Sequence, residues 1–409
     1  MTAQTPSANA EGKTLLRLWI AGDEKLSRLW DVLPEARIVG GAVRDRIAGR
    51  AVSDIDLASP LKPETVSGRL AAAGIRAVPT GLDHGTVTAV LDGRHFEITT
   101  LRRDVETDGR HAVVAFTEDW REDAARRDFT INAMSMERDG TIHDHFGGQA
   151  DLAAGLVRFV GDPATRIRED FLRILRFFRF YGRYAVSPPD ADAIDAIRSL
   201  REGLSQLSAE RVWSEIKRIL AAPDPLPALR LMAETGVLPL VLPEAASLAA
   251  LERLQARGAP ADPLLRVAAL IGGQIQPLAR RLKLADAERA RLAAIAAAPD
   301  LPADADAATL RRALAERPAA VLADRSWLTA DDGDRSALRQ RLATTERPAF
   351  PLKGRDVLAL GAEAGPSVGA ALAAVRRWWI ERDCLPDEAA CRAELARHLE
   401  HFPIHRERM

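Results

Sequence analysis

The sequence of 409 residues has little cysteine, almost no net charge and no long apolar run. Its two cysteines, Cys384 and Cys391, are too few for a disulfide framework or a zinc site of four thiolates, which indicates a reducing compartment and predicts a cytoplasmic protein. A formal net charge of −1 excludes a global basic field, so a nucleic-acid partner would have to meet a local patch. No stretch reaches about 18 uninterrupted apolar residues, so neither a membrane span nor a membrane partner is predicted.

The organisation of the chain changes near residue 155. The opening MTAQTPSANAEGKT lacks the basic and apolar regions of a signal peptide, and we expect a tail followed by a helix from about Leu15 within residues 1–30. Strand patterns and tight turns dominate residues 31–155, whereas residues 156–225 and 226–409 have helical patterns. The chain is also too long for one ordinary core. The predicted fold class is therefore α+β, with an N-terminal mixed sheet and helices followed by all-α segments; the oligomeric state stays open.

Local patterns place several elements within these divisions. GTVTAVLDGRHFEITTLR consists of two alternating runs joined by Asp92-Gly93, which predicts a hairpin. KPETVSGRLAAAG predicts a helix, with proline near its start and glycine at its end. DPATRIREDFLRILRFFRFYGRY predicts one long amphipathic helix, and LSAERVWSEIKRILAA another with Ser208 as its N-cap. Beyond residue 226, Ala/Leu/Arg-rich segments broken by proline and glycine predict short packed helices.

Two acids stand in strand-like sequence just after a glycine pair. In Ser53-Asp54-Ile55-Asp56-Leu57 the acids share one face, and the apolar residues turn into the core. Adjacent carboxylates repel each other, and hard oxygen ligands at this spacing suit Mg²⁺. Such ions support phosphoryl transfer by activating a hydroxyl and holding the leaving phosphates. The alternative is a solvated strand face with an N-cap.

The surroundings of these acids favour an anion site. Val39-Gly40-Gly41 leads into AVRDRIAG, a predicted short helix that ends at Gly49. Glycines at such a position let backbone N–H groups, including that of Gly41, approach a phosphate, and Arg44 lies one turn further on. Glu97 alternates with apolar residues in the hairpin's second strand, so it is a candidate third acid beside the pair. The alternative for Glu97 is an exposed strand glutamate.

GGAVRD followed by SDID resembles the DNA polymerase β-type nucleotidyltransferase superfamily, and more narrowly the bacterial (class II) tRNA nucleotidyltransferase/poly(A) polymerase family. Further segments match in the family's order: RRDFTINAM (126–134), DHFGGQADL (144–152), EDFLRILRFFRF (169–180) and ERVWSEIKRIL (210–220). His145 stands where the family more often has proline. The resemblance covers residues 37 to 220, and several motifs in order are far more specific than any one of them.

The resemblance implies a fold and a reaction. It implies a nucleotidyltransferase head over 31–155, a neck over 156–225 and an RNA-holding body and tail over 226–409. The implied activity is template-independent addition of CCA to tRNA 3′ ends from CTP and ATP, with release of pyrophosphate. Asp54 and Asp56 would carry Mg²⁺, and Glu97, by its position in the alternating strand, remains the candidate third catalytic acid.

The resemblance also implies roles for an arginine-rich stretch in the neck. Asp170 and Arg173 would act as a protein template that matches the hydrogen-bonding edge of C or A. The base or the triphosphate would be held by a set of further arginines: Arg127, Arg176 and Arg179. Asp128 and Asn132 either join this site or brace the motif structurally. Residues 101–120, polar and with little periodicity, resemble the family's flexible loop or form an ordinary surface loop.

Alternatives remain at this point. A poly(A) polymerase of the same family would share nearly every motif, although GLDHGTVTAV before the hairpin is more similar to the tRNA enzymes. An enzyme that adds only CC, or only A, is also compatible. An RNA-binding protein with a degenerate head is the non-enzymatic alternative, which the complete D-x-D and E-D-x-x-R set disfavours. Trp378-Trp379 would either stack on RNA or pack between helices.

Overall fold

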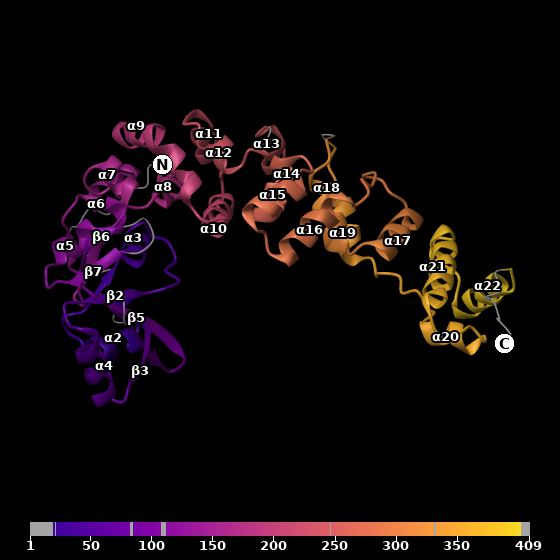
Figure 1. Cartoon of the computed structure of the whole chain (residues 1–409), viewed down its shortest axis with the longest axis horizontal. Coiled ribbons are helices and arrows are strands. Elements are labelled where there is room, and N and C mark those ends of the chain that lie inside the picture. The colour runs from indigo at the N-terminus through magenta and orange to yellow at the C-terminus, as the bar shows by residue number, and fades with distance from the viewer. Residues whose placement is uncertain are drawn as a thin grey trace. The chain divides into compact units, whose positions relative to one another are not determined.

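The computed structural model describes residues 19–20, 22–81, 85–107, 112–245, 247–330 and 333–401. The chain divides into two compact units, Met1–Pro243 and Glu244–Met409 (Figure 1). Most of the helix expected from about Leu15 falls outside the described residues. The finer divisions expected at residues 30, 155 and 225 stay predictions.

A mixed sheet of seven strands is the scaffold of the first unit. The strand order is β3-β4-β5-β2-β1-β8-β9, and β2–β5 is its parallel pairing, the other pairings being antiparallel. The strands are β1 (Arg37–Val39), β2 (Asp56–Ser59), β3 (Arg76–Gly81), β4 (Thr86–Leu91), β5 (Arg94–Thr100), β8 (Met134–Met136) and β9 (Ile142–Asp144). The α+β class predicted from the sequence is confirmed.

The local turn predictions in this unit are confirmed. Leu91 pairs with Arg94 across a turn whose central residues, Asp92 and Gly93, have φ of 45° and 78°. Two positive φ values define the primed turn that matches the twist of the two strands. The expected helices are α4 (Pro63–Ala72) and α3 (Gly41–Ile47), the latter followed by Gly49 at φ +67°.

The segment 101–120 differs from its prediction as a loop with little regular structure. It contains a separate two-stranded antiparallel sheet, β6 (Arg102–Thr107) and β7 (Ala112–Phe116). The register shifts between Asp104 and Glu106. Because an irregularity of this kind interrupts the alternation of side chains along a strand, the sequence showed no clean two-residue period. Residues 108–111, including Gly109, lie outside the described residues.

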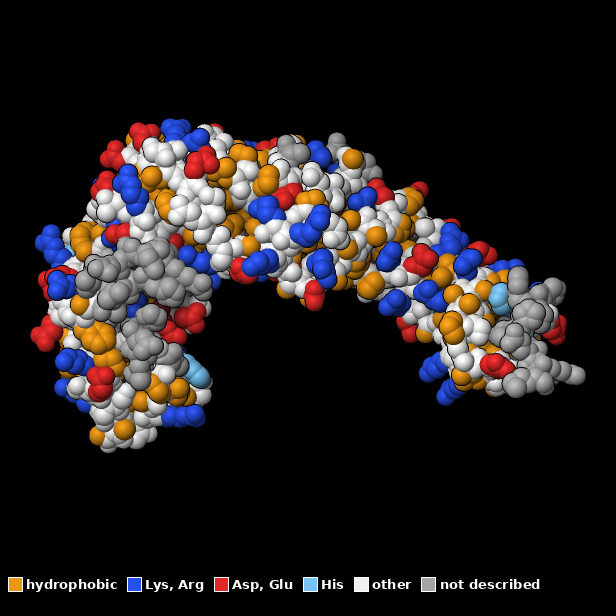
Figure 2. Space-filling model, in the orientation of Figure 1, with side chains coloured by type: hydrophobic (Ala, Val, Ile, Leu, Met, Phe, Trp, Pro, Cys, Tyr) orange, Lys and Arg blue, Asp and Glu red, His pale blue; other side chains and the backbone are white. Residues whose placement is uncertain are grey.

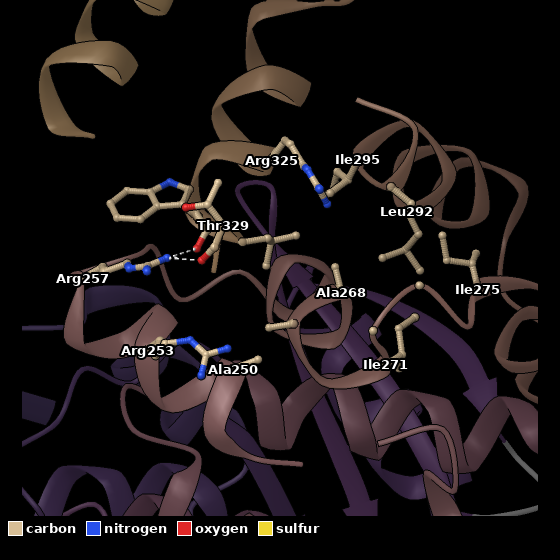
Figure 3. Close-up of a pocket in the computed structure, with 16 residues that line it drawn as sticks. Ala250, Arg253, Arg257, Ala268, Ile271, Ile275, Leu292, Ile295, Arg325 and Thr329 are labelled. Carbon is tan, nitrogen blue, oxygen red and sulfur yellow. Dashed lines mark hydrogen bonds between the residues drawn. The ribbon is translucent and has the colours of Figure 1, made fainter. Parts of the chain in front are cut away.

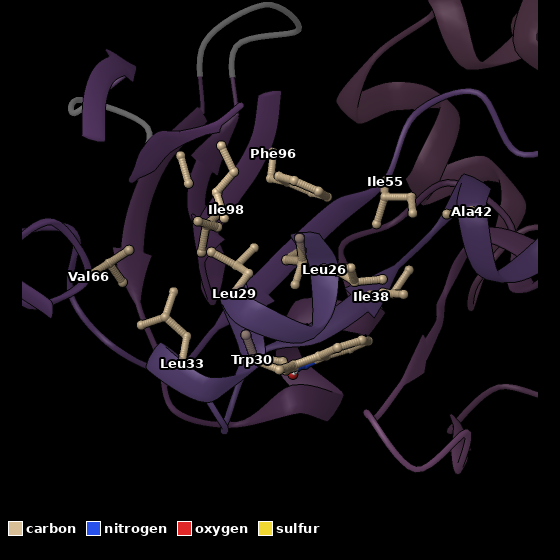
Figure 4. Packing of buried hydrophobic residues seen from close by; sticks show 14 of the residues in the cluster. Leu26, Leu29, Trp30, Leu33, Ile38, Ala42, Ile55, Val66, Phe96 and Ile98 are labelled. Carbon is tan, nitrogen blue, oxygen red and sulfur yellow. Dashed lines mark hydrogen bonds between the residues drawn. The ribbon is translucent and has the colours of Figure 1, made fainter. Parts of the chain in front are cut away.

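The core of the sheet lies on the face covered by α2 (Glu24–Val32) and α4 (Figure 4). Leu26, Leu29 and Trp30 of α2 are fully buried against sheet residues such as Phe96 and Ile98. The Trp30 Nε1 atom donates a hydrogen bond of 2.6 Å to the carbonyl of Ala36. Burial of each large apolar side chain contributes roughly 1.5–3 kcal/mol. Side chains that alternate with these residues project to the other face, where the acids lie.

The rest of the first unit is mostly helical. Its elements are α5 (Trp120–Ala125), η2 (Thr130–Asn132), α6 (Gly148–Ala154), α7 (Pro163–Glu169), α8 (Leu172–Tyr184), α9 (Ala191–Leu200), η3 (Arg201–Gln206), α10 (Ala209–Leu220), α11 (Leu226–Glu234) and α12 (Leu238–Val241). Phe129 packs against Phe159 and Phe180, with ring centroids 4.8 and 5.3 Å apart, so the motif before β8 is fixed to α8. Ser208 is the N-cap of α10 as predicted, although its side chain makes no cap hydrogen bond.

The prediction of one continuous helix over residues 162–184 was wrong. Helix α7 ends at Glu169, and Asp170 has extended backbone with φ −158° and ψ 107°. An Asp170 oxygen accepts a hydrogen bond of 3.1 Å from the backbone N–H of Leu172, the first residue of α8. A short aspartate that bonds the backbone ahead of it favours a new helix start over continuation. Helical periodicity on both sides of the break concealed it.

The second unit consists of short helices, as predicted: α13 (Ala249–Ala256), α14 (Pro263–Ile271), α15 (Ile275–Leu282), α16 (Asp286–Ala296), α17 (Ala307–Glu316), α18 (Ala319–Trp327), α19 (Ser336–Thr344), α20 (Gly354–Ala359), α21 (Pro366–Glu381) and α22 (Glu388–His401). Trp379 is buried in an apolar cluster of the last helices, and its Nε1 donates to the Pro386 carbonyl over 3.0 Å. Trp378 is half-buried, with the Arg382 guanidinium 4.5 Å from its ring. Of the two roles considered for this pair, stacking on RNA or packing between helices, Trp379 therefore has the packing role.

Candidate functional site

Acidic side chains meet at the middle of the sheet. Asp56 is the first residue of β2, and in the parallel register of β2 with β5 it stands opposite Glu97. Both residues are exposed, whereas Ile55 and Leu57 are buried. The alternation predicted for this stretch is therefore confirmed, and the sheet places the two acids on the same face.

Asp54 lies just before β2 and is also exposed. The Ser53 hydroxyl donates a hydrogen bond of 2.9 Å to Asp54 Oδ2. Desolvation by surrounding protein atoms raises the pKa of Asp56 above its usual range, and the negative charges of Glu97 and Asp54 raise it further, while Arg127 opposes the shift. Ionisation of Asp56 is therefore less favourable here than for an aspartate in water, and a nearby cation would favour it.

The chemistry of these donors fits a magnesium ion. Carboxylate oxygens are hard ligands, and Mg²⁺ is usually bound through one or two carboxylates plus water and substrate phosphates. Within the described part of the chain, no three side chains of His, Cys, Asp or Glu are grouped closely enough to hold a metal by themselves. The Asp54–Asp56 pair, which needs phosphate oxygens to complete a ligand set, remains the candidate.

A glycine turn brings a cation beside these acids. Gly40, the N-cap of α3, has φ +65° and ψ −121°, a conformation that side chains disfavour. A Cβ atom built at Gly40 would lie 3.0 Å from Nη1 of Arg127. The Arg127 Nη2 atom donates a hydrogen bond of 3.0 Å to Asp123, which is buried. The absence of a side chain at Gly40 therefore lets the Arg127 guanidinium lie against the start of α3, close enough to Asp56 to affect its pKa.

Arg44 has a different environment from the one expected. Its side chain is buried and donates to Asn132 Oδ1, and it also bonds Asp45 over 3.0 and 3.1 Å. Its guanidinium lies 4.6 Å from the ring centroid of Tyr184, whose hydroxyl donates to Asp45. These contacts fix α3 to α8. The predicted contact of Arg44 with an anion stays a prediction.

Asp128 and Asn132 form a buried brace under the site. Asp128 Oδ1 accepts hydrogen bonds of 2.9 Å from the Asn132 amide and from the backbone N–H of Phe129. Its other oxygen accepts a bond of 2.6 Å from Arg176 Nε. Burial alone would raise the pKa of Asp128, but the Arg176 charge and the hydrogen bonds outweigh it and hold the pKa below its usual range. These contacts agree with the alternative in which Asp128 and Asn132 brace the motif structurally.

The predicted template residues lie next to each other but are not paired. Asp170 Oδ2 accepts a hydrogen bond of 2.7 Å from Arg211 of α10. Arg173 donates to Glu169 and, over 3.0 Å, to the Arg166 carbonyl. Both residues are half-buried. The two helices thus present a carboxylate and a guanidinium at the α7–α8 break, each held by its own partner.

Arg179 is tied to α10 in the same way. Its Nε donates a hydrogen bond of 2.7 Å to Glu215, a carboxylate that is 2% exposed and also accepts from Arg218 over 3.1 Å. Sequence reasoning missed Arg211 and Glu215 as partners of the arginine stripe. Both stand in the matched segment 210–220, but no local pattern indicates which residue a long side chain will bond.

Two family models match the chain. A model described as the poly A polymerase head domain matches residues 36–158, and one described as the probable RNA and SrmB-binding site of polymerase A matches residues 189–248. The mouse protein named CCA tRNA nucleotidyltransferase 1, mitochondrial, is 38% identical over 359 residues, which are 84% of this chain and 82% of that relative. The CCA-adding enzyme of Geobacillus thermodenitrificans is 40% identical over 205 residues, half of each chain.

Solved structures agree with these matches. The Bacillus stearothermophilus CCA-adding enzyme in complex with CTP superimposes with a TM-score of 0.73 and 26% identity, covering 93% of this chain and 99% of that one. The Thermotoga maritima CCA-adding enzyme complexed with tRNA has the same fold, with a TM-score of 0.60, 19% identity and coverage of 96% of both chains.

Proposed function

This chain belongs to the CCA tRNA nucleotidyltransferase family, and we propose that it adds CCA to the 3′ end of tRNA from CTP and ATP. The observation that carries this function is the 38% identity to the mouse CCA tRNA nucleotidyltransferase across 82% of that relative. The similarity to a CCA-adding enzyme solved with CTP supports the same substrate class. Its partners are accordingly tRNA, CTP and ATP.

The reaction forms one bond and breaks another at the α-phosphorus. The 3′ oxygen of the RNA attacks the α-phosphate in line, loses its proton, and pyrophosphate leaves with the electron pair of the broken P–O bond. We assign Asp54 and Asp56 to Mg²⁺, which when bound would offset the charge of carboxylates and phosphates. The register of Asp56 with Glu97 supports this assignment, because it places two carboxylates on one sheet face; desolvation, and then the charges of Glu97 and Asp54, raise the pKa of Asp56.

The start of α3 is the proposed seat of the phosphates. The Gly41 backbone N–H lies in the first turn of α3, and Arg127 lies against the adjoining Gly40. A guanidinium offers five N–H donors and uses one of its end nitrogens on Asp123, so donors remain for a phosphate. Arg44 is proposed to act on the same anion; its bonds to Asn132 and Asp45 indicate that it does so mainly by fixing α3.

Nucleotide selection is proposed for the α7–α8 break. Asp170 has about four acceptor sites on its two oxygens, and Leu172 and Arg211 occupy two of them. Asp170 and Arg173 would then present an acceptor and a donor to a base edge, as C and A both require. Arg176 and Arg179, anchored by Asp128 and Glu215, would hold the base or the triphosphate with their remaining N–H groups.

One assay decides among the family's activities. Purified protein is incubated with tRNA that ends at the discriminator base, each nucleoside triphosphate is supplied singly and together, and the products are sequenced. CCA addition predicts CC with CTP alone and CCA with both. A tail of A residues would instead identify a poly(A) polymerase, and a stop after CC, or A added only to tRNA-CC, a partial enzyme. Absence of any addition would leave an RNA-binding protein.

We propose the cytoplasm as the compartment, because the chain has only two cysteines. None of the helices in the described ranges is long and apolar enough to cross a bilayer. The mouse, zebrafish and human relatives are mitochondrial by name. Fractionation of cells that express the full-length protein distinguishes the two compartments.

A further inference from the structure

A pocket of about 390 Å³ lies within the second unit, among α13, α14, α16 and α18 (Figure 3). Ligand pockets in proteins typically have volumes of roughly 300–1,000 Å³. Figure 3 shows Arg253 and Arg257 at one side of the pocket, Leu292 and Ile275 at the other, and Arg325 at the top of the view next to Ile295. The described lining residues include no aspartate and no glutamate. The pocket therefore combines cations with an apolar wall.

Two of its three arginines are available to a ligand. Arg257 donates to the carbonyls of Trp327 and Thr329, over 3.2 and 2.8 Å, and so fixes the end of α18. Arg253 and Arg325 make no side-chain hydrogen bond or ion pair with another described residue. The Nε atom of Arg325 is shielded from water and has no hydrogen-bond partner among them.

Two acids on the helices that form the pocket are already engaged. Asp324 precedes Arg325 on α18, but it accepts a bond of 2.9 Å from Arg291. Asp262, which caps α14, accepts from Arg291 as well, over 2.8 Å. A guanidinium N–H that is shielded from water without a hydrogen-bond partner, as Nε of Arg325 is, is unfavourable, and an anion beside it would lower that cost.

We propose that this pocket binds a nucleotide, with its phosphate on Arg325 and Arg253 and its sugar and base against the apolar wall. Phosphate matches the fork of a guanidinium, and the volume, at the small end of the range, suits one nucleotide with a single phosphate. The nucleotide is either free in solution or part of an RNA strand, and only the second source rests on the proposed function. Figure 2 shows Lys and Arg side chains gathered over α15 and α16, and Arg280, Lys283 and Arg289 of this region are exposed.

Photolabelling of the full-length protein with 8-azidoadenosine 5′-monophosphate, followed by peptide mapping, tests the proposal. Label in peptides from 250–275 or 292–329 is expected for a free nucleotide. Arg325→Gln should weaken labelling about tenfold or more, as for loss of a charged hydrogen bond. Arg289→Gln is the matched control, since this exposed arginine on α16 pairs with Asp286 and does not line the pocket; it should leave labelling unchanged.

Arg253→Gln is a second pocket variant that should fold normally, because Arg253 is exposed and its replacement removes no core contact. It should also weaken labelling. If the source is RNA, tRNA that carries 8-azidoadenosine should label the same peptides, and both pocket variants should lower tRNA affinity. Three results would overturn the proposal. They are label in neither arm, label that both variants leave unchanged, and protection of the segment by octanoate but not by AMP. CTP incorporation, measured separately, reports on the proposed function alone.

Discussion

Arg176 and Asp128 join two segments that stand 48 residues apart: Nε of Arg176 donates a hydrogen bond of 2.6 Å to Oδ2 of Asp128. Asp128 is 7% exposed, and its other oxygen holds the Asn132 amide and the Phe129 N–H. The pair therefore connects the sheet-bearing part of the first unit to helix α8, where nucleotide selection is proposed.

Loss of this pair should lower stability in an acid-dependent way. Asp128→Asn is expected to lower the free energy of unfolding by about 3 kcal/mol, because removal of one partner leaves the other charge uncompensated. The folded pKa of Asp128 is depressed, so its contribution is present above the unfolded value of about 3.9 and is lost as pH falls through the lower folded value. Denaturant unfolding of wild type and variant should thus differ by a constant amount above about pH 3.9 and converge as the pH is lowered further. Additive effects of Asp128→Asn and Arg176→Gln in a double-mutant cycle would contradict the coupling.

A comparison of Gly40→Ala with Gly49→Ala should separate the effect of backbone strain from the effect of displacing Arg127. A Cβ at Gly40 would meet Arg127 Nη1 at 3.0 Å, whereas a Cβ at Gly49, also at positive φ, meets nothing within 4 Å. Gly49→Ala should lose about 1 kcal/mol of stability because its φ is positive, and Gly40→Ala should lose more, because φ +65° with ψ −121° lies outside the left-handed helical region. Only Gly40→Ala should weaken CTP binding and slow incorporation. Equal incorporation by the two variants would remove the role of Arg127 at this turn.

Asp54→Ala or Asp56→Ala should abolish nucleotide addition while the fold is kept. Loss of a metal ligand removes electrostatic stabilisation of the transferring phosphate, the main catalytic contribution in this reaction. Both side chains are exposed, so circular dichroism should be unchanged. Glu64→Gln is the control, since this exposed glutamate of α4 lies on the helix-covered side of the sheet. Near wild-type incorporation by either alanine variant would contradict the assignment of that acid.

Mg²⁺ together with CTP should raise the melting temperature by ligand linkage. The cause is local: desolvation and the charges of Glu97 and Asp54 disfavour ionised Asp56, and a cation relieves that repulsion. Thermal melting in EDTA, in Mg²⁺ alone and in Mg²⁺ plus CTP measures the effect. Asp54→Asn should show a much smaller rise. A rise of the same size in this variant would indicate that the ions bind elsewhere.

Asp170→Ala and Arg173→Ala should alter the choice of nucleotide more than the rate of chemistry. A hydrogen bond to a charged group contributes roughly 1.5–3 kcal/mol, so discrimination against UTP and GTP should fall by about ten- to a hundredfold per contact. Competition assays with all four nucleotides measure this. If the two residues serve only their observed partners, Arg211 and Glu169, both variants will keep C and A selectivity and lose only stability. Arg211→Ala is the comparison, because it frees Asp170 without removing it.

Local rules predicted much of the first unit. Asp92-Gly93 predicted the hairpin because a primed turn needs two positive φ values, and the alternation around Asp56 predicted its face because strand side chains alternate. The break at Asp170 was missed because it depends on one side chain bonding its own backbone. The strands β6 and β7 were missed because a register shift interrupts their alternation.

The candidate site was predictable as a list of residues but not as a set of contacts. The acids and arginines were named from motifs, yet the sequence did not indicate that Arg176 bonds Asp128 or that Arg179 bonds Glu215. A guanidinium on a flexible stem reaches several acceptors, and the tertiary packing decides which one is near. Arg44, expected at the anion, is instead buried against Asn132, an outcome that no helical spacing indicates.

The order of strands in the sheet also governs how the protein emerges during synthesis. Strand β1 lies between β2 and β8, and β8 begins only at Met134. A nascent chain that has exposed residues 37–100 can pair β3, β4, β5, β2 and β1, but β1 then has an open edge. Unpaired strand edges recruit other chains, so a ribosome that pauses before Met134 presents an aggregation-prone intermediate. Codon choice over residues 101–136 would therefore affect the yield of folded protein.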